Sequence, residues 1–449
     1  MIVPANAESV AGGARLWGER YDGAADDDQA SAIVASPDGS KVFVTGFSNG
    51  SIAGFSDYAT VAYDASTGAE LWAKRYDGPA EGYDLARSIA LSADGSKVFV
   101  TGSSDGGPTS FDYATLAYDA STGGKLWARR YTGPGEADSL PHSIAASPDG
   151  SAVVVTGETG VSTGGGDYAT VAYDGSTGAK LWTKRYDGPS AGLDIARSVA
   201  VSPTSSAVFV TGESSSGANR DFATLAYDAS SGHRLWTARY DGPASGYDAA
   251  SALAVSPDGS GIVVTGTSTG ITSRDYGTVA YDASTGGQVW TTRYNGPADG
   301  LDRASSIDAT PGASAVYVTG RSTGTGTGTD FATVAYDSST GDRVWTRRYN
   351  GTGNGNDSAT SIAGSVDGSK VFVTGFSLET SGSCFCATIA YESSAGARLW
   401  LKRRHGPSIG DRSASSLAAS PDGSRVFVTG SVSQPSTFVH DYLTVAYAS

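Results

Sequence analysis

"AYDASTGAELW", residues 62–72, is the stretch that decides the fold, because the chain repeats its frame along almost its whole length. Each complete copy runs from Ala-x-Asp to a Trp ten residues after the Ala. The seven copies begin at Ala62, Ala117, Ala172, Ala226, Ala280, Ala335 and Ala390. There are eight Trp, however, spaced 54 or 55 residues apart: Trp17, Trp72, Trp127, Trp182, Trp236, Trp290, Trp345 and Trp400. A constant period of this size with strand-like patterns predicts a β-propeller.

One repeat predicts four strands. They cover residues 88–92 ("SIALS"), 97–102 ("KVFVTG"), 113–118 ("YATLAY") and 125–131 ("KLWARRY"). The Asp94-Gly95 pair is a hairpin signal between the first two strands, and a Ser-Thr-Gly turn joins the last two. Small residues dominate the first strand, whereas the fourth carries Trp and Arg. We therefore expect the first strand at the crowded centre of the ring and the fourth at its rim.

The closing repeat explains why the counts differ. Variants of "VFVTG" occur eight times, but only three strands follow Arg412. Residues 15–21, "RLWGERY", match the missing fourth strand. Pairing the two ends of the chain in one sheet would remove an exposed edge. The sequence predicts an all-β protein, an eight-bladed propeller of four-stranded antiparallel blades over residues 13–449, preceded by an N-terminal tail of residues 1–12.

Composition excludes some classes of partner. The chain has 449 residues and a net charge of −15, and no apolar run is long enough to span a membrane. Clustered Lys and Arg, which nucleic acids and anionic membranes require, are absent from the sequence. The Lys and Arg that follow each Trp are interpreted as a solvated outer face. We expect a monomer that binds no nucleic acid.

Two short features bear on the compartment. Ala5-Asn6-Ala7 resembles the end of a secretory signal peptide, although the charged and apolar regions that should precede it are missing. Cys384 and Cys386 lie two residues apart on one predicted strand, near the upper limit of disulfide geometry. They indicate neither a disulfide framework nor a zinc site. We expect a secreted or periplasmic protein.

The repeated frame resembles a known motif. Ala-x-Asp-x-x-Thr-Gly-x-x-x-Trp, intact at 62–72, 117–127, 172–182, 280–290 and 335–345, is similar to the tryptophan-docking motif of the PQQ-like β-propeller superfamily. Ser231, Glu392 and Ala395 depart from it. Residues 75–102 also resemble the bacterial SBBP-type propeller repeat. The resemblance implies that the eight Trp are structural, each ring docking on the adjacent blade while Asp, Thr and Gly hold the turn.

The resemblance has a consequence for cofactors. Some members of the superfamily are quinoprotein dehydrogenases, which use PQQ with calcium and a disulfide between adjacent Cys. Here the two Cys are not adjacent, and every Trp belongs to the repeat. We therefore expect no PQQ and predict no cofactor apart from the calcium hypothesis below. Other members of the superfamily are scaffolds without chemistry.

An Asp enters the first strand of most repeats and has two readings. These residues are Asp28, Asp84, Asp194, Asp248, Asp302 and Asp357, replaced by Ser139 and Arg412 in two repeats. Six carboxylates around one mouth could attract a hard cation such as calcium. The favoured reading is that each Asp caps its own turn. The Asp residues before the third strand are read in the same way: Asp57, Asp112, Asp167, Asp221, Asp275, Asp330 and Asp441.

A catalytic site in a repeat protein should show as broken repetition. The closing repeat carries such departures, and His405, Asp411, Arg412 and His440 could meet there as an acid–base or anion-holding cluster. Drift of the closing repeat is the favoured explanation. An enzyme (a lyase, hydrolase or quinoprotein-like oxidoreductase) with an axial site near this repeat is the alternative function.

Variable polar loops point to binding instead. The loops between the second and third strands differ most, as at 47–57, 213–221, 321–330 and 431–441. Such loops on a rigid scaffold are where recognition commonly resides. The favoured hypothesis is a non-catalytic, exported propeller that binds a glycan or a protein through this face. A structural module of a larger surface protein is the third hypothesis.

Overall fold

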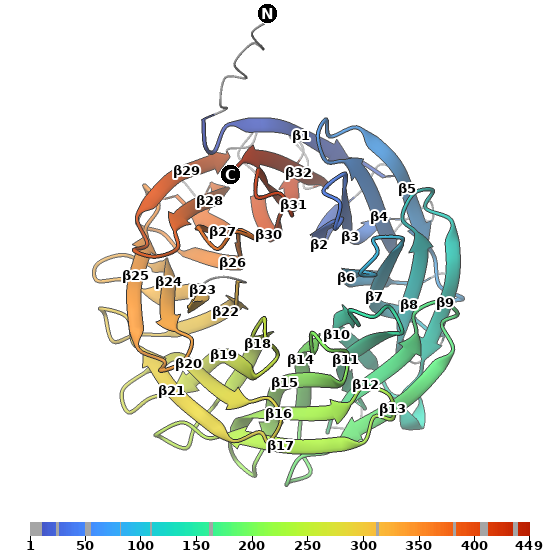
Figure 1. The fold of residues 1–449 in the computed structure, drawn as a ribbon, viewed down its shortest axis with the longest axis horizontal. Helices are drawn as coiled ribbons and strands as arrows, with labels where there is room; N and C mark the ends of the chain where they lie inside the picture. The colour runs from blue at the N-terminus through green and yellow to red at the C-terminus, as the bar shows by residue number, and fades with distance from the viewer. Residues whose placement is uncertain are drawn as a thin grey trace, which may run out of the picture.

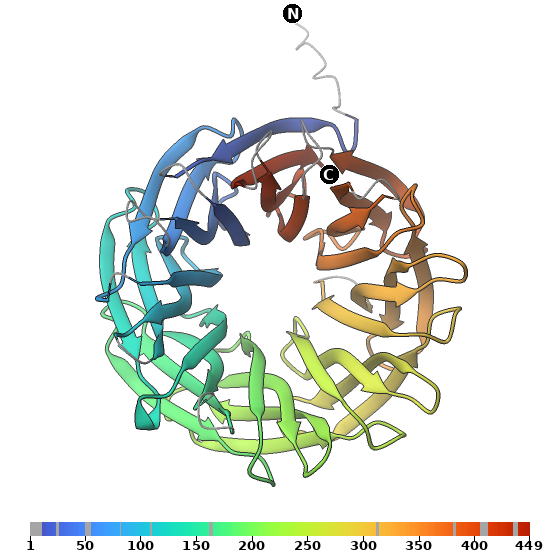
Figure 2. The same cartoon turned by 180° about the vertical axis from the view of Figure 1, so that it is seen from behind.

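The chain forms a closed ring of eight four-stranded antiparallel sheets, or blades (Figure 1). The computed structural model describes residues 11–23, 27–49, 55–80, 82–107, 110–160, 165–310, 314–379, 383–404, 412–433 and 439–449. The predicted eight-bladed propeller is confirmed. The view from behind shows the same continuous ring without a break between the first and last blades (Figure 2).

The blades are numbered along the chain, and blade 8 contains both ends of the described chain. Blade 1 comprises β2 Asp28–Ala35, β3 Lys41–Asn49, β4 Ser56–Asp64 and β5 Glu70–Tyr76, and blade 2 comprises β6 Asp84–Leu91, β7 Lys97–Asp105, β8 Phe111–Asp119 and β9 Lys125–Tyr131. Blade 3 comprises β10 Ser139–Ala146, β11 Ala152–Thr159, β12 Asp167–Asp174 and β13 Lys180–Tyr186, and blade 4 comprises β14 Asp194–Val201, β15 Ala207–Ser215, β16 Arg220–Asp228 and β17 Arg234–Tyr240. Blade 5 comprises β18 Ala249–Val255, β19 Gly261–Thr269, β20 Arg274–Asp282 and β21 Gln288–Tyr294, and blade 6 comprises β22 Asp302–Asp308, β23 Ala315–Thr323, β24 Thr329–Asp337 and β25 Arg343–Tyr349. Blade 7 comprises β26 Asp357–Gly364, β27 Lys370–Leu378, β28 Cys384–Glu392 and β29 Arg398–Arg404, and blade 8 comprises β30 Arg412–Ala419, β31 Arg425–Ser433, β32 His440–Ala448 and β1 Arg15–Tyr21.

The order of strands within a blade follows the bulk of their side chains. The first strand of each blade lies innermost around the axis and the fourth lies at the rim, as predicted (Figure 1). The second and third strands are buried on both faces, because a neighbouring blade covers each side. Among the described residues the only helix is the three-residue 3-10 turn Pro134–Glu136, and none has the length and apolar character to cross a membrane.

The ring closes in blade 8, where strands from the two ends of the chain pair. β1 runs antiparallel to β32, with Arg15 opposite Tyr447 and Tyr21 opposite Tyr442. The Gly13 amide also donates to the Ala448 carbonyl at 2.7 Å. Strand β1 therefore supplies the fourth strand of this blade, as the sequence predicts. The proposed division into a tail and a domain stays a prediction, since residues 1–10 lie outside the described part.

The core consists of layers between neighbouring blades. Among the described residues, a Trp lies in each of these layers. In the layer between blades 1 and 2, Trp72 packs with Val98, Val100 and Tyr118 of the next blade. The Trp72 indole donates to the Ala120 carbonyl at 3.2 Å. A side chain at Gly123, whose φ is +68°, would meet the indole at 2.7 Å. Only glycine accepts this conformation at low cost and lets the ring approach so closely.

The closing segment completes the eighth docking site. Gly13 has φ +76° and lies against Trp400 of blade 7, as Gly68 with φ +81° lies against Trp17. The docking turn of blade 8 is thus assembled from residues at opposite ends of the sequence. This explains why the chain has eight Trp and seven complete motifs.

Candidate functional site

Two sets of connections emerge at the same end of the ring, which we call the upper face. They are the links between blades and the loops between the second and third strands of each blade, because successive strands alternate in direction. The tight Asp-Gly and Thr-Gly turns lie on the opposite, lower face. Of the variable loops, 213–221 and 321–330 lie wholly within the described residues.

The six Asp residues that were candidates for a calcium site lie at the upper ends of the innermost strands, and all are fully buried. Each accepts a hydrogen bond from the amide of a Gly that precedes it by five or six residues. In blade 3 the Ser139 hydroxyl accepts the equivalent bond from Gly133 at 3.1 Å. This is the contact that the turn-cap reading requires.

The six carboxylates do not come together as one group. Among the described residues, no group of three or more metal-ligating side chains with ligand atoms within 4.8 Å of one another contains two of the six. Instead, Asp84 is grouped with Asp57 and Asp77 at its own blade junction, and three other junctions repeat this pattern. Burial raises the pKa of Asp84 to about 6. Calcium binding stays a prediction.

The Asp residues before the third strand form ion pairs with an Arg of the fourth strand, and the turn-cap interpretation of these Asp stays a prediction. Asp57 Oδ2 accepts from Arg75 Nη2 at 2.9 Å, and Arg75 also donates to the Ser48 carbonyl at 2.7 Å. The same pairing recurs at Asp112, Asp167, Asp221, Asp275, Asp330 and Asp441. The interpretation of the Lys and Arg after each Trp as a solvated outer face was wrong for this one Arg of the outer strand, because it forms an ion pair within its own blade.

Blade 7 shows the same Arg without its acidic partner. Phe385 stands where the other blades have Asp. The Arg403 guanidinium lies 5.3 Å from the centre of the Phe385 ring and 5.5 Å from that of Tyr349. A cation–π contact thus replaces the ion pair.

The cluster predicted in the closing repeat is only partly visible. His405 and Asp411 lie outside the described residues, as does the side chain of Arg412, whose backbone begins β30. His440 begins β32, and its Nδ1 lies 2.5 Å from an Asp27 carboxylate oxygen at the start of blade 1. This contact joins the closing blade to the first one. The acid–base cluster stays a prediction.

The most marked break in repetition lies elsewhere, on the second strands of blades 3 to 6. The position after Val-Thr-Gly holds Glu158 in blade 3, Glu213 in blade 4, Thr267 in blade 5 and Arg321 in blade 6. The remaining blades have Phe or Ser there. This position is near the upper end of the second strand, so its side chains lie beneath the upper face. The sequence signal for these residues is the column after Val-Thr-Gly, where the repeats differ in charge once all eight are aligned.

Glu213 is the centre of this cluster and is 2% exposed. Its carboxylate accepts from Arg197 at 2.9 Å and from Arg220 at 2.6 Å. The Tyr247 hydroxyl donates to it at 3.0 Å. Burial alone would raise the pKa of Glu213, but the hydrogen bonds from the two Arg outweigh it and hold the pKa below its usual value.

A cavity of about 290 Å³ opens beside Glu213. It is lined by His142, Arg197, Glu213, Tyr247, Ala249, Ala250, Ser251, Thr267 and Arg303. We call this the Glu213 pocket. His142 Nε2 lies 3.3 Å from Glu158, and burial lowers the pKa of His142 below its usual value, which keeps the imidazole neutral at pH 7. Four blades contribute residues to this one pocket.

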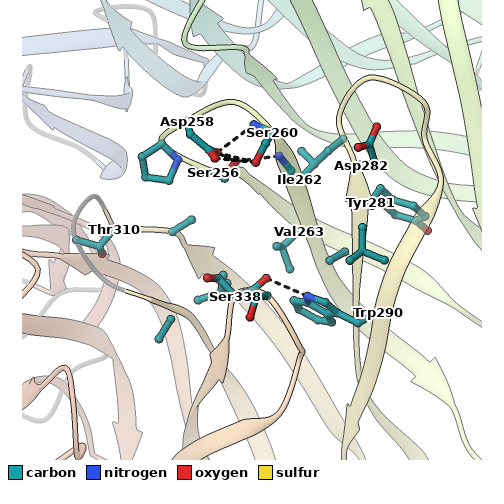
Figure 3. A pocket seen from close by; sticks show the side chains of 18 residues that line it. Ser256, Asp258, Ser260, Ile262, Val263, Tyr281, Asp282, Trp290, Thr310 and Ser338 are labelled. Atoms are coloured by element: carbon teal, nitrogen blue, oxygen red, sulfur yellow. Dashed lines mark hydrogen bonds between the residues drawn. The ribbon is translucent and has the colours of Figure 1, made fainter.

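A larger cavity of about 570 Å³ lies on the lower side, between blades 5 and 6 (Figure 3). Trp290 and Val263 face it, and the Trp290 indole donates to the Ser338 carbonyl at 3.0 Å (Figure 3). In six other blades a Phe or Tyr in the position of Val263 contacts the docking Trp, as Phe43 does with Trp72 at a centroid distance of 5.8 Å. Blade 3 has Val154 at this position. Val263 also lacks the ring and faces the cavity, and we interpret this space as a packing cavity.

A family match covers most of the ring. The family model described as outer membrane protein assembly factor BamB matches residues 5–127, 112–278 and 275–434. The chain belongs to this PQQ-like β-propeller family. The resemblance to the SBBP repeat stays a prediction.

One curated enzyme is similar to part of the chain, and solved structures are similar to nearly all of it. The quinohemoprotein alcohol dehydrogenase ADH IIB of Pseudomonas putida is 34% identical over 133 residues, which are 27% of this chain and 16% of that enzyme. BamB from Moraxella catarrhalis is 15% identical, with a TM-score of 0.52 over 97% of this chain and 99% of its own. Sqt1 from Chaetomium thermophilum is 12% identical, with a TM-score of 0.64 over 97% and 98%. At these identities the two solved structures show the fold alone.

The residues present do not fit a PQQ site. All eight Trp belong to the outermost strands, so none is placed to stack on a quinone near the axis. Cys384 and Cys386 are not bonded to each other. The aromatic ring of the Glu213 pocket, Tyr247, already has Arg220 and Arg274 against it, with ring-centre distances of 5.7 and 4.7 Å.

Proposed function

We propose that this chain is a non-catalytic binding propeller whose recognition site is the Glu213 pocket together with the neighbouring loops of the upper face. The observation that carries this proposal is one pocket, in an otherwise repetitive ring, at which charged departures from adjacent blades come together. Repetition is what packing between equal blades requires. Four adjacent blades that place unlike polar groups around one cavity indicate selection for a ligand.

The chemistry of the pocket favours binding over catalysis. A general base needs a pKa near the working pH and access to the substrate. The Glu213 carboxylate instead has a lowered pKa and accepts hydrogen bonds from two Arg and one Tyr. His142 is occupied by Glu158. The ion pairs and hydrogen bonds of these groups therefore fix the shape and the charge of the pocket, as a binding site requires.

The ligand class and the compartment are also part of the proposal. Sqt1 has been solved bound to the N-terminus of the ribosomal protein L10, so a propeller of similar fold holds a protein segment. The BamB description of the family and Ala5-Asn6-Ala7 support a role outside the cytoplasm. We propose an exported protein whose ligand is a protein segment or a glycan.

A glycan array and a peptide array, probed with the purified chain, test this function. We expect specific binding that is lost in Tyr247→Ala and retained in Lys180→Ala, a matched control on the lower face. Tyr247 packs on two Arg but begins no strand, so the fold should survive its removal. Binding that depends on Lys180 and not on Tyr247 would place the site elsewhere and reject the proposal.

An enzyme near blade 8 is the second candidate, and the partial match to a quinohemoprotein alcohol dehydrogenase is the observation that favours it. In that case, replacing His405 and Arg412 by Ala should abolish turnover of a defined substrate while the melting temperature changes little. Turnover without any ligand on either array would replace the binding proposal with this one.

A further inference from the structure

We propose that the Glu213 pocket binds a carboxylate group, which Arg303 and Thr267 receive. This inference rests on the binding function proposed above and names the chemistry of its ligand. It starts from side chains in the pocket whose hydrogen-bonding capacity is unused.

Thr267 supplies the first unused group. Its side chain lies on β19 and is 3% exposed, and its hydroxyl has no hydrogen-bond partner among the described residues. A buried hydroxyl without a partner costs about 1–3 kcal/mol. Because Thr267 lines the pocket, a ligand atom that accepts a hydrogen bond would remove this cost.

Arg303 supplies the second unused group. It lies on β22 and is exposed, and within the described part of the chain it has neither an ion pair nor a hydrogen bond. Its neighbour across the sheet is Arg321, another cation. The two guanidinium groups raise the local positive potential in a chain whose net charge is −15. A planar guanidinium matches the two oxygens of a carboxylate.

The charge balance of the lining favours a single negative charge. Arg197 and Arg303 are cationic, Glu213 is anionic and His142 is neutral, so the lining carries one net positive charge. A carboxylate neutralises it. A doubly charged phosphate would leave an excess negative charge next to the buried Glu213, which is unfavourable.

The walls of the pocket suit the carbon skeleton of such a ligand. Tyr247 is held in place by its bond to Glu213 and by Arg274 against its ring. Ala249 and Ala250 add a small apolar surface, and Ser251 adds a hydroxyl. A cavity of about 290 Å³ is near the lower limit for ligand pockets, which suits one sugar acid or one acidic side chain.

Isothermal titration calorimetry with four probes tests the inference. The acids are glucuronate and the tripeptide Gly-Glu-Gly, and the uncharged comparators are glucose and Gly-Gln-Gly with blocked termini, as in the acidic peptide. Arg303→Ala and Thr267→Val remove the two unused donors. Arg87→Ala is the matched control, since Arg87 occupies the column of Arg197 in blade 2 but does not line the pocket.

We expect one acid to bind, its comparator to bind at least tenfold more weakly, and Arg303→Ala to weaken the acid about tenfold. Thr267→Val should weaken it several-fold while the melting temperature stays or rises, because an unpaired buried hydroxyl is removed. Arg87→Ala should leave binding unchanged. Glucuronate and the peptide distinguish a sugar acid from a protein as the source.

Three results overturn the inference. The first is the absence of binding by either acid. The second is equal affinity for an acid and its uncharged comparator, and the third is binding that Arg303→Ala leaves intact. None of them rejects the binding function itself, because a Tyr247-dependent signal on the arrays would still support it. Failure on the arrays as well would reject both.

Discussion

At the scale of single residues, Val263 lies beside a space in a repeated core. Its counterparts Phe43, Phe99, Phe209 and Phe372 are almost fully buried against their docking Trp, and Val154 of blade 3 is 1% exposed. Val263 is 6% exposed and faces the cavity of about 570 Å³. The cavity removes van der Waals contacts from Trp290. This local defect sits in a sheet whose backbone register matches that of the other blades.

We expect Val263→Phe to raise the free energy of unfolding by about 0.5–2 kcal/mol, because the ring fills the cavity beside Trp290. Urea denaturation followed by Trp fluorescence measures the change. Val264→Phe is the control: its side chain points to the opposite face of β19 and is fully buried. It should destabilise by about 1–3 kcal/mol through overpacking. Equal effects at the two positions would contradict this reading of the cavity.

The Arg–Asp pairs give a second test at this scale. Asp275 and Arg293 have 8% and 22% of their side chains exposed, and Arg293 also donates to the Ser268 carbonyl. Asp275→Ala leaves this half-buried cation without its carboxylate and should cost about 1–3 kcal/mol of unfolding free energy. Asp167→Ala should cost at most about 1 kcal/mol, because its partner Arg185 is 43% exposed. Urea midpoints of the two variants, measured at equal ionic strength, test this difference, and an equal loss in both would contradict it.

At the scale of elements, blade 8 takes its fourth strand, β1, from the opposite end of the chain, so no short turn joins β1 to its neighbour β32. Within blade 1, residues 65–69 connect β4 to β5, a loop of five. In blade 8 the corresponding residues are 449 and 11–14, again five, but divided between the two ends. The geometry of an ordinary blade is therefore present without the covalent link.

A circular permutant tests this equivalence. Joining Ser449 directly to Ala11 and opening the chain before Asp27 should give a protein with the circular dichroism spectrum and melting temperature of the parent. A chain of residues 27–449 alone lacks β1, so β32 becomes an exposed edge and Trp17 no longer docks. We expect its melting temperature to fall by about 10 °C or more, with aggregation. A permutant as unstable as the truncated chain would show that the link matters more than the strand.

At the scale of the whole molecule, two sets of Asp residues make stability depend on pH in opposite directions. Serine hydroxyls and turn amides lower the pKa of the lower-face residues Asp38, Asp94, Asp149, Asp258, Asp367 and Asp422 to about 2. Burial raises the pKa of Asp84 to about 6 and also raises that of Asp28, Asp194, Asp248, Asp302 and Asp357. One set lies in the turns and the other around the axis.

The sign of each effect follows from proton linkage. For the lower-face set the folded state binds fewer protons than the unfolded state, so stability is lost as pH falls from about 4 to 2. For the axial set the folded state binds more protons, so stability is lost as pH rises above about 4, and for Asp84 this loss continues to about pH 6. We expect the urea midpoint to be highest at about pH 4, and Asp84→Asn to reduce the fall above it. A midpoint that rises steadily up to pH 7 would contradict these shifts.

The sequence by itself determined the ring. The period of the Trp, the pairing of "RLWGERY" with the three C-terminal strands and the inner position of the small-residue strand all rest on local patterns repeated in every blade. Eightfold repetition averages out the errors of any single pattern, which is why the strand order was predictable. The turn caps were predictable for the same reason, since each Asp and its Gly lie close together in the chain.

Only the tertiary structure decided where the ring departs from its own symmetry. Glu213, Tyr247, Thr267 and Arg303 belong to three blades, and long side chains bring them to one cavity across blade junctions. In seven blades an Arg of the outer strand likewise pairs with Asp57 or its counterpart, which lies 18 or more residues away in the chain. Such contacts depend on the curvature of the ring and the direction of each side chain. Both exist only once the blades have packed, because neighbouring blades fix the positions from which those side chains extend.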